Sequence, residues 1–486
     1  MPDCVGARLD RIVSEELPRM VAIGSIKSWQ PGRGPVITWT ASTASREAMA
    51  RADVDVLPPS FQQAQHLRTA HFARTLKREV PRLIMVSWDV DGWCDVASMT
   101  EAINTHIRRH DTYHSRFEVE GAEAETMIRR TVADPGLIEF VPAPVGFMEA
   151  DEIRAHVVTT TPDTLDWDCF TFGVVQKPDH FTVYAIIDHL HTDGSSAALV
   201  YTDIHLTYQA LMCDVPNPLP DPAGYRDFAA RQRLHVESMT LDSRPVRDWV
   251  DFARTAGSAW PSFPLELGDT SAHSAGRAIT VELLDGDDTE AFDLACRSAG
   301  ARFSGGVMAC AALADHRLTG ADAFHTFTPS DCRAGETESL SAGWYASLFP
   351  VSVPIGNGDF AELARAAQKS FDANRHLSGV PFDRVLDLAR DDLGQSVPRR
   401  PSMMVSLMDF RRVADAEANR LGIYIDELSH GGINMWVSRN PDQTIVTVSL
   451  PDTPEARHSV HHYVGVLRSV FLEAAARAKR AFAHSA

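Results

Sequence analysis

The spacing of apolar and polar positions in the first half of the chain predicts strands and helices in alternation. Apolar and β-branched residues dominate 82–88 and 181–187, and short runs of this kind predict buried strands. Apolar positions recur at helical spacing over 95–109, which predicts an amphipathic helix. Another helix is expected to begin after Ser60, whose side chain is a suitable N-cap. The first half is therefore expected to form an α/β unit.

The second half repeats this alternation after a proline-rich break at 216–222. A helical connector is expected to run through Trp249 to about residue 259. The elements predicted beyond it are strands at 278–284, 348–353 and 443–450 and helices at 289–299, 305–318 and 454–484. No repeat of fixed period is visible in the sequence, so the pattern alone suggests two similar α/β halves.

These patterns divide the chain into four predicted parts. They are an N-terminal extension and lead-in (1–55), a first lobe (56–222), a connector (223–260) and a second lobe (261–486). A length of 486 residues is long for one hydrophobic core and suits two domains of ordinary size.

Composition and charge exclude several classes of protein. A net charge of -19 argues against a nucleic-acid partner, because phosphates require a basic surface. No apolar run reaches the ~18 residues of a membrane-spanning helix, and the first residues lack the apolar core of a signal peptide. The seven cysteines are scattered and form no Cys-x-x-Cys pair, so we expect reduced thiols. A cytoplasmic location is expected, either free or peripheral to the membrane.

The candidate chemistry lies at 188–194, with the sequence Asp-His-Leu-His-Thr-Asp-Gly, between a predicted strand and a predicted helix. As His-x-His-x-Asp, the segment resembles the zinc motif of metallo-β-lactamase-like hydrolases, with His189, His191 and Asp193 as ligands. As His-x-x-x-Asp-Gly, it resembles the active-site motif of acyltransferases related to chloramphenicol acetyltransferase and to condensation domains.

The zinc interpretation lacks further ligands. Gly194 stands where hydrolases of that class usually have another histidine. The downstream histidines have no strand-end context that singles one of them out; they are His205, His235, His273 and His325. We therefore expect no metal at this segment.

The acyltransferase interpretation gains support from segments that resemble the condensation superfamily in their order along the chain. They are PPSFQQAQ (58–65), RHDTYHSRF (109–117), YRDFA (225–229), GWYASLFPV (343–351) and VPFD (380–383). Within that superfamily, the sequence is most similar to the polyketide-associated (Pap) acyltransferases of mycobacterial type, especially the members that acylate trehalose. The segments that carry this similarity are 58–68, 107–115, 167–170, 300–307 and 381–386. The resemblance covers nearly the whole chain from Trp29 onward.

The resemblance implies an α/β fold with two chloramphenicol-acetyltransferase-like lobes. Each lobe would have a mostly antiparallel or mixed sheet with flanking helices, and the lobes would form a V with a channel between them. His189 would lie midway along the channel as the general base, for which neutral imidazole is well suited. No acyl-enzyme is required, and the chain has no Gly-x-Ser-x-Gly elbow that would provide one.

The resemblance assigns structural roles to residues around this base. Asp193 is expected to pair with Arg333 and hold the loop, and Gly194 to allow a sharp turn that leaves the helix N-terminus open towards an oxyanion. His110 and Arg116 are expected to be structural in the first lobe.

Three other side chains keep two interpretations. His191 is either a second group facing the channel or a bystander that is packed or exposed to solvent. Trp344 and Tyr345 either line the acyl channel or pack as core aromatics.

The chain departs from the family pattern at two places. Asp188 replaces the first histidine of the usual pair, at a position expected to support the site rather than to catalyse. An Asp-Phe-Gly-Trp-Gly segment is missing from the C-terminal part, and the nearest substitute, 408–411, is poor. This second departure leaves the element that bridges the two lobes without a sequence signal.

The predicted function is transfer of a fatty or polyketide acyl group from a thioester to a hydroxyl of a sugar such as trehalose. The donor would be acyl-coenzyme A or an acyl group on a carrier protein or polyketide synthase, and the acceptor trehalose or an acyl-trehalose. We expect a monomer without a cofactor. The alternatives are a free-standing condensation enzyme that joins carrier-bound substrates by an amide or ester bond, the zinc hydrolase, and a non-catalytic binding relic of the fold.

Overall fold

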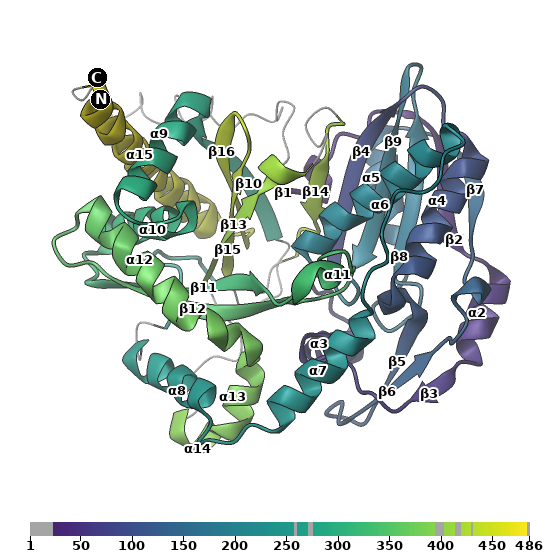
Figure 1. Cartoon of the computed structure of the whole chain (residues 1–486), viewed down its shortest axis with the longest axis horizontal. Coiled ribbons are helices and arrows are strands. Elements are labelled where there is room, and N and C mark those ends of the chain that lie inside the picture. Colours follow the sequence, from purple (N-terminus) through teal and green to yellow (C-terminus); the bar gives the residue numbers. More distant parts are fainter. Residues whose placement is uncertain are drawn as a thin grey trace.

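Two β-sheets with helices packed against them form the two lobes of the protein (Figure 1). The computed structural model describes residues 23–256, 260–270, 276–393, 403–413, 419–428 and 431–483. Each sheet lies over its own hydrophobic core, as expected of a chain of this length. The predicted α/β class, with two lobes of mixed sheets and flanking helices, is confirmed.

The first lobe contains a seven-stranded sheet that is antiparallel apart from one strand pair. Its order is β1 (Ile23–Ser25), β14 (Gly422–Ile425), β4 (Leu83–Asp91), β9 (His180–Asp188), β8 (Phe170–Gln176), β2 (Gly34–Ala41) and β7 (Phe140–Met148). The central strand β9 is buried on both faces, which explains its nearly continuous apolar sequence. Val183 and Ile187 point into one core, while Tyr184 and Ile186 point into another on the opposite face.

Helices cover both faces of this sheet. The larger core lies beneath α4 (Val96–Arg109) and α6 (Gly194–Met212), and the smaller one beneath α5 (Ala150–Thr159). A small sheet of β3 (Asp53–Asp55), β6 (Thr126–Thr131) and β5 (Ser115–Glu120) completes the lobe. The remaining helices of this half are α2 (Thr43–Ala50) and α3 (Phe61–Leu76). As predicted, Ser60 caps α3, and its Oγ accepts a hydrogen bond from Gln63 N at 3.2 Å.

Residues 23–55, which the sequence suggested were a lead-in, contribute strands to the first sheet. β2 lies between β8 and β7, and the side chains of Val36 and Trp39 are buried in the two cores. The alternation of residues along β2 places one face of this strand on each core.

The second lobe contains a six-stranded mixed sheet. Its order is β10 (Gly276–Asp285), β16 (Gln443–Pro451), β15 (Ile433–Arg439), β13 (Met403–Asp409), β11 (Ala323–Asp331) and β12 (Ala346–Pro354). Its helices are α9 (Gly286–Ser298), α10 (Phe303–Thr319), α11 (Gly335–Ser339), α12 (Phe360–Asn374), α13 (Phe382–Leu388), α14 (Arg390–Leu393) and α15 (Pro454–Ala483).

The predicted connector forms two helices, α7 (Tyr225–Glu237) and α8 (Arg244–Ala256). The core of the second lobe includes Trp249 and Phe252 of α8, which pack near Phe327 of the sheet. In contrast, α7 begins beside the first lobe, because Tyr225 N donates to Asp111 Oδ1 at 2.7 Å. The end of the connector near residue 259 lies outside the described residues.

One strand of the second half crosses into the first lobe and joins its sheet (Figure 1). After β13, the chain forms β14, which pairs with β4 in an antiparallel register before β15 returns to the second sheet. Asp426 follows β14, and its Oδ2 accepts hydrogen bonds from the backbone amides of Arg82 at 2.7 Å and Leu83 at 2.9 Å. The lobe-bridging element therefore exists, although the sequence segment that would signal it is missing.

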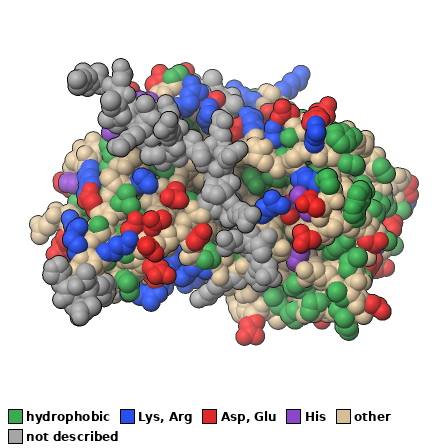
Figure 2. All heavy atoms as spheres, turned by 90° about the horizontal axis from the view of Figure 1, so that it is seen from above, with side chains coloured by type: hydrophobic (Ala, Val, Ile, Leu, Met, Phe, Trp, Pro, Cys, Tyr) green, Lys and Arg blue, Asp and Glu red, His purple; other side chains and the backbone are tan. Residues whose placement is uncertain are grey.

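The surface bears both charges in mixture. In the view of Figure 2, basic and acidic side chains are interspersed over the visible face rather than gathered into one basic area. Among the described helices, none is long and apolar enough to cross a membrane.

Candidate active site

The segment 188–194 forms the turn between β9 and α6, at the junction of the two lobes. Asp188 ends the central strand, and Asp193 caps the helix that begins at Gly194. The strand therefore fixes the start of the turn and the helix fixes its end, and the two histidines lie between these fixed points. This rigid support is what a catalytic side chain requires.

His189 is half-buried and lies against an aromatic ring of the second lobe. Its imidazole stacks on Trp344 with 3.7 Å between ring centroids and 28° between ring planes. The backbone amide of His189 donates to Arg82 O at 2.6 Å, which anchors the turn to β4. Burial, followed by the nearby His66, lowers the pKa of His189 to about 4, although Asp193 and Asp188 oppose this shift. The imidazole is therefore neutral at physiological pH.

Asp193 is buried and accepts hydrogen bonds from both lobes. Its Oδ1 accepts from Ser196 N at 2.8 Å, and its Oδ2 accepts from the amides of Tyr345 at 2.9 Å and Ala346 at 3.1 Å. The Arg333 guanidinium completes the set, with Nη1 and Nη2 each 3.3 Å from a carboxylate oxygen. Burial raises the pKa of Asp193, but Arg333 and Ser196 outweigh burial and hold it below its ordinary value.

The structure brings the predicted partners Asp193 and Arg333 together, and it adds Ser196, which the sequence analysis missed. Ser196 Oγ accepts from Arg333 Nη2 at 2.7 Å and donates to Gly343 O at 2.8 Å. Arg333 is itself buried, and its guanidinium lies 4.1 Å from the centroid of the Tyr345 ring. This cluster fastens the start of α6 to the second lobe.

Gly343 allows the close approach of the lobes. Its φ of 152° favours glycine, and a Cβ there would lie 2.3 Å from the Tyr225 ring. Gly194 is needed for a different reason. Its φ is not positive, but a Cβ at this position would lie 3.2 Å from Met408 Cε. The expected sharp turn at Gly194 is therefore replaced by a close contact with the second lobe. The amide of Ser196 in the first turn of α6 is already engaged by Asp193.

Of the residues with two interpretations, His191 and Tyr345 are buried and engaged in packing. His191 Nδ1 hydrogen-bonds with Thr112 Oγ1 at 3.1 Å, and burial lowers its pKa to about 4. Tyr345 donates to Ser341 Oγ at 2.9 Å and packs with Tyr225 and Phe228. Their geometry favours the packed alternative, whereas Trp344 lies directly against His189.

The geometry does not support the zinc interpretation. Among the described residues, the side chains close enough to share a metal ion are His106, His110 and Asp203, whose ligand atoms lie within 4.8 Å of one another. The group of His189, His191 and Asp193 does not meet this condition. Asp193 is instead committed to Arg333 and to backbone amides.

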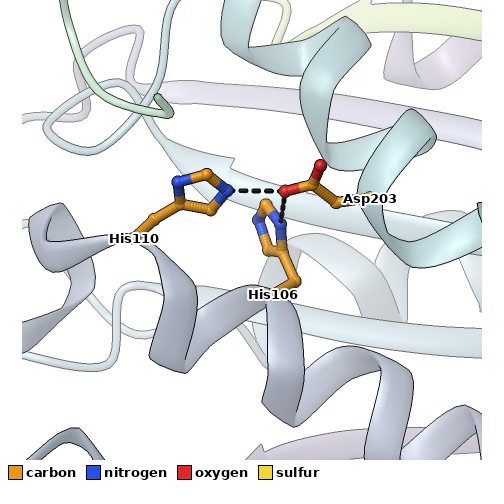
Figure 3. A group of neighbouring side chains, drawn as sticks. All are labelled: His106, His110 and Asp203. Carbon is orange, nitrogen blue, oxygen red and sulfur yellow. Dashed lines mark hydrogen bonds and ion pairs between the residues drawn. The ribbon is translucent and has the colours of Figure 1, made fainter. Parts of the chain in front are cut away.

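The cluster in Figure 3 is better explained by hydrogen bonds than by a cation. Asp203 Oδ2 accepts from His110 Nε2 at 2.6 Å and from His106 Nδ1 at 3.2 Å, and Arg109 Nε lies 3.4 Å away. His110 Nδ1 accepts the amide of Ala342 at 3.2 Å, so that both ring nitrogens are engaged. His110 is held by a carboxylate on α6 and by a backbone amide of the second lobe, which agrees with the structural role expected of it.

A second buried cluster surrounds Asp188, the residue that departs from the family motif. Its Oδ1 accepts from His66 Nε2 at 2.7 Å, and its Oδ2 from Arg82 Nη1 at 3.1 Å and Thr164 Oγ1 at 2.6 Å. Burial raises the pKa of Asp188, but His66 and Arg82 outweigh it, so that the carboxyl is ionised. Sequence reasoning missed His66. The available signal was an acidic residue at a buried strand end, which requires a partner.

Comparison with known proteins gives a consistent result. The model of the condensation domain family matches residues 84–398. Trehalose-2-sulfate acyltransferase PapA2 from Mycobacterium tuberculosis is 42% identical over 464 residues, which cover 94% of this chain and 98% of the relative. The 2'-acyl-2-O-sulfo-trehalose (hydroxy)phthioceranyltransferase PapA1 of the same species is 38% identical over 467 residues, with 94% and 89% covered.

Solved structures show the same relationship. A structure described as PapA2 acyl transferase matches with a TM-score of 0.88 at 42% identity, covering 93% of this chain and 99% of that one. The condensation domain of the monacolin K polyketide synthase MokA matches with a TM-score of 0.67 at 16% identity, covering 87% and 98%, which shows a shared fold.

Proposed function

Because this acyltransferase belongs to the condensation domain family and within it to the Pap group, we propose that it esterifies a hydroxyl of a trehalose-type sugar. The acyl group would be a fatty or polyketide chain supplied as a thioester, by coenzyme A or by a carrier protein. The names of two relatives describe transfer to sulfated trehalose derivatives, which supports this class of acceptor. We expect the enzyme to act as a monomer in the cytoplasm.

The proposed mechanism uses His189 as the general base. Neutral imidazole removes the proton from the acceptor hydroxyl as its oxygen attacks the thioester carbonyl carbon. The tetrahedral intermediate then collapses, the carbon–sulfur bond breaks, and the imidazolium returns its proton to the departing thiolate. The protein forms no covalent intermediate, and His189 is neutral again once the thiol has left.

The observation that carries this proposal is the position of His189. It is a neutral, half-buried imidazole on a turn that is fixed by the central strand, by α6 and by the Asp193–Arg333 pair. Trp344 of the second lobe covers one face of the ring, so that the base lies where both lobes meet. A positioned base of this kind typically contributes a factor of about 10²–10⁴ to the rate.

A product screen tests the proposal. Acyl-coenzyme A donors of several chain lengths are incubated with trehalose, sulfated trehalose and simple alcohols, and the products are identified by mass spectrometry. We expect sugar esters from the wild type and a loss of about 10²-fold or more in His189→Ala. His71→Ala is the control, because this histidine lies on α3 but is not among the buried residues of that helix, and its loss should leave activity unchanged. Full activity in His189→Ala would contradict the mechanism.

The alternative condensation activity gives a different result in the same screen. Transfer to a carrier-bound amine, with none to sugar hydroxyls, would favour the condensation enzyme. No transfer from any thioester donor to any acceptor would favour a non-catalytic relic.

A further inference from the structure

His66 is a second imidazole beside the proposed base, on a different element. It comes from α3, and its ring centroid lies 6.4 Å from that of His189. Trp344 contacts both rings, stacking on His189 and meeting His66 edge-on at 5.5 Å. Two histidines and one indole therefore surround the same small region at the junction of the lobes.

Asp188 fixes the orientation of His66. The ionised carboxylate can only accept, so His66 Nε2 carries the hydrogen of their 2.7 Å hydrogen bond. Nδ1 is then the ring nitrogen that can meet a ligand. Thr164 and the amide of Leu190 also donate to Asp188, so the carboxylate is held from several sides.

His66 is not the sole partner of Asp188. The Arg82 guanidinium, 3.1 Å from Asp188, supplies the positive charge that compensates this buried carboxylate. Arg82 is held in turn by the carbonyls of Pro162 at 2.9 Å and Thr161 at 3.1 Å.

On this basis we propose that His66 Nδ1 binds the acceptor, through a hydrogen bond with the hydroxyl next to the one that His189 activates. The site would thus select a vicinal diol, as sugars carry, over a simple alcohol. This inference rests on the proposed function and specifies the acceptor group that the site recognises. Asp188, at the position where the family motif has a histidine, acts through His66 as a positioning residue.

The distance between the rings suits such an acceptor. With 6.4 Å between the ring centroids, two neighbouring oxygens of one small acceptor can each lie at a hydrogen-bond distance of about 2.8 Å from a different imidazole. A single hydroxyl would satisfy His189 alone and leave His66 Nδ1 without a partner. Sites built to bind a hydroxyl discriminate against analogues that lack it for this reason.

The test compares two acceptors that differ only in the neighbouring hydroxyl, cyclohexanol and its vicinal diol, with a coenzyme A thioester that the wild type uses. We expect His66→Leu to lower kcat/KM for the diol by about 10- to 100-fold and for cyclohexanol by less than about threefold. In His66→Gln, the amide nitrogen can donate to Asp188 while its oxygen accepts from the acceptor. This variant should recover part of the preference for the diol.

Controls separate this inference from a structural role and from failure of the proposed function. His71→Gln, on the same helix, should leave the ratio of the two acceptors unchanged. If His66→Leu does not fold, His66→Asn replaces it, because this side chain is polar but too short to reach the acceptor. Equal losses on both acceptors in a folded variant would overturn the inference while leaving the acyltransferase proposal intact. Failure of the wild type to acylate any hydroxyl would instead overturn the proposed function.

Discussion

Replacement of Asp193 by alanine should destabilise the junction between the lobes. In the native protein, the carboxylate accepts from three backbone amides and from the Arg333 guanidinium, and both side chains of this pair are about 2–3% exposed. Removal of one partner of a buried ion pair costs about 3–5 kcal/mol, because the remaining charge loses its compensation. Arg333 keeps Asp331 and Ser341 O as partners, which places the expected loss near the lower end, at about 3 kcal/mol.

Urea denaturation followed by tryptophan fluorescence measures this loss. With a slope of about 3 kcal/mol per M, the midpoint of the affected transition should fall by about 1 M. The matched control is Asp331→Ala, which removes a carboxylate from the same guanidinium at a side chain that is 43% exposed. Because Asp331 is itself largely exposed and Arg333 keeps Asp193 as its buried partner, the loss should be about 1 kcal/mol or less, so that this midpoint should move little. Equal shifts in the two variants would refute the assignment of Asp193 as the buried anchor.

Three further predictions concern pH and local packing. His110 and His191 are buried with pKa values lowered to about 4, so they stay neutral in the folded state while the unfolded chain takes up protons below pH ~6.5. Between pH 6.5 and 4, stability should therefore fall by up to about 3 kcal/mol per pH unit as pH decreases, and urea midpoints across this range would show it. Gly343→Ala places a Cβ 2.3 Å from an aromatic ring of α7 at a φ of 152°. The free energy of unfolding should fall by about 1–3 kcal/mol, as measured by calorimetry. An unchanged melting temperature would contradict the packing described. Trp344→Ala should open His189 to water and raise the pKa of His189 from about 4 towards the ordinary ~6.5. The acid limb of the pH profile of kcat/KM should then move to higher pH. An unmoved limb would show that burial by the indole does not set this pKa.

Local sequence patterns were sufficient for most elements of the fold. The run at 181–187, the cap at Ser60 and the helical spacing over 95–109 correspond to β9, α3 and α4, because a strand or helix of this kind depends on its own residues. The pairing of Asp193 with Arg333 also followed from the sequence, but through family resemblance. These residues are 140 positions apart, and no local pattern connects them.

Elements that depend on distant partners were not predictable in this way. β14 is four residues long and becomes a strand by pairing with β4 of the other lobe, a contact that its own sequence does not signal. Likewise, Ser196 and His66 resemble ordinary helix residues until the fold brings Arg333 and Asp188 to them. Tyr345 could be placed either in a core or at a substrate surface until its contacts with Tyr225 and Phe228 were known.

The sequence by itself therefore determined the fold class, the motif turn and the candidate base, since each is written in short-range periodicity or in a contiguous motif. Only the tertiary structure decided what surrounds that base. Burial and the Trp344 ring keep His189 neutral, the second lobe holds Asp193 from the far side, and Asp188 recruits His66 from α3. The physical reason is that burial and charge compensation depend on all the groups that converge at a point, and the chain brings these groups together only when both lobes have folded.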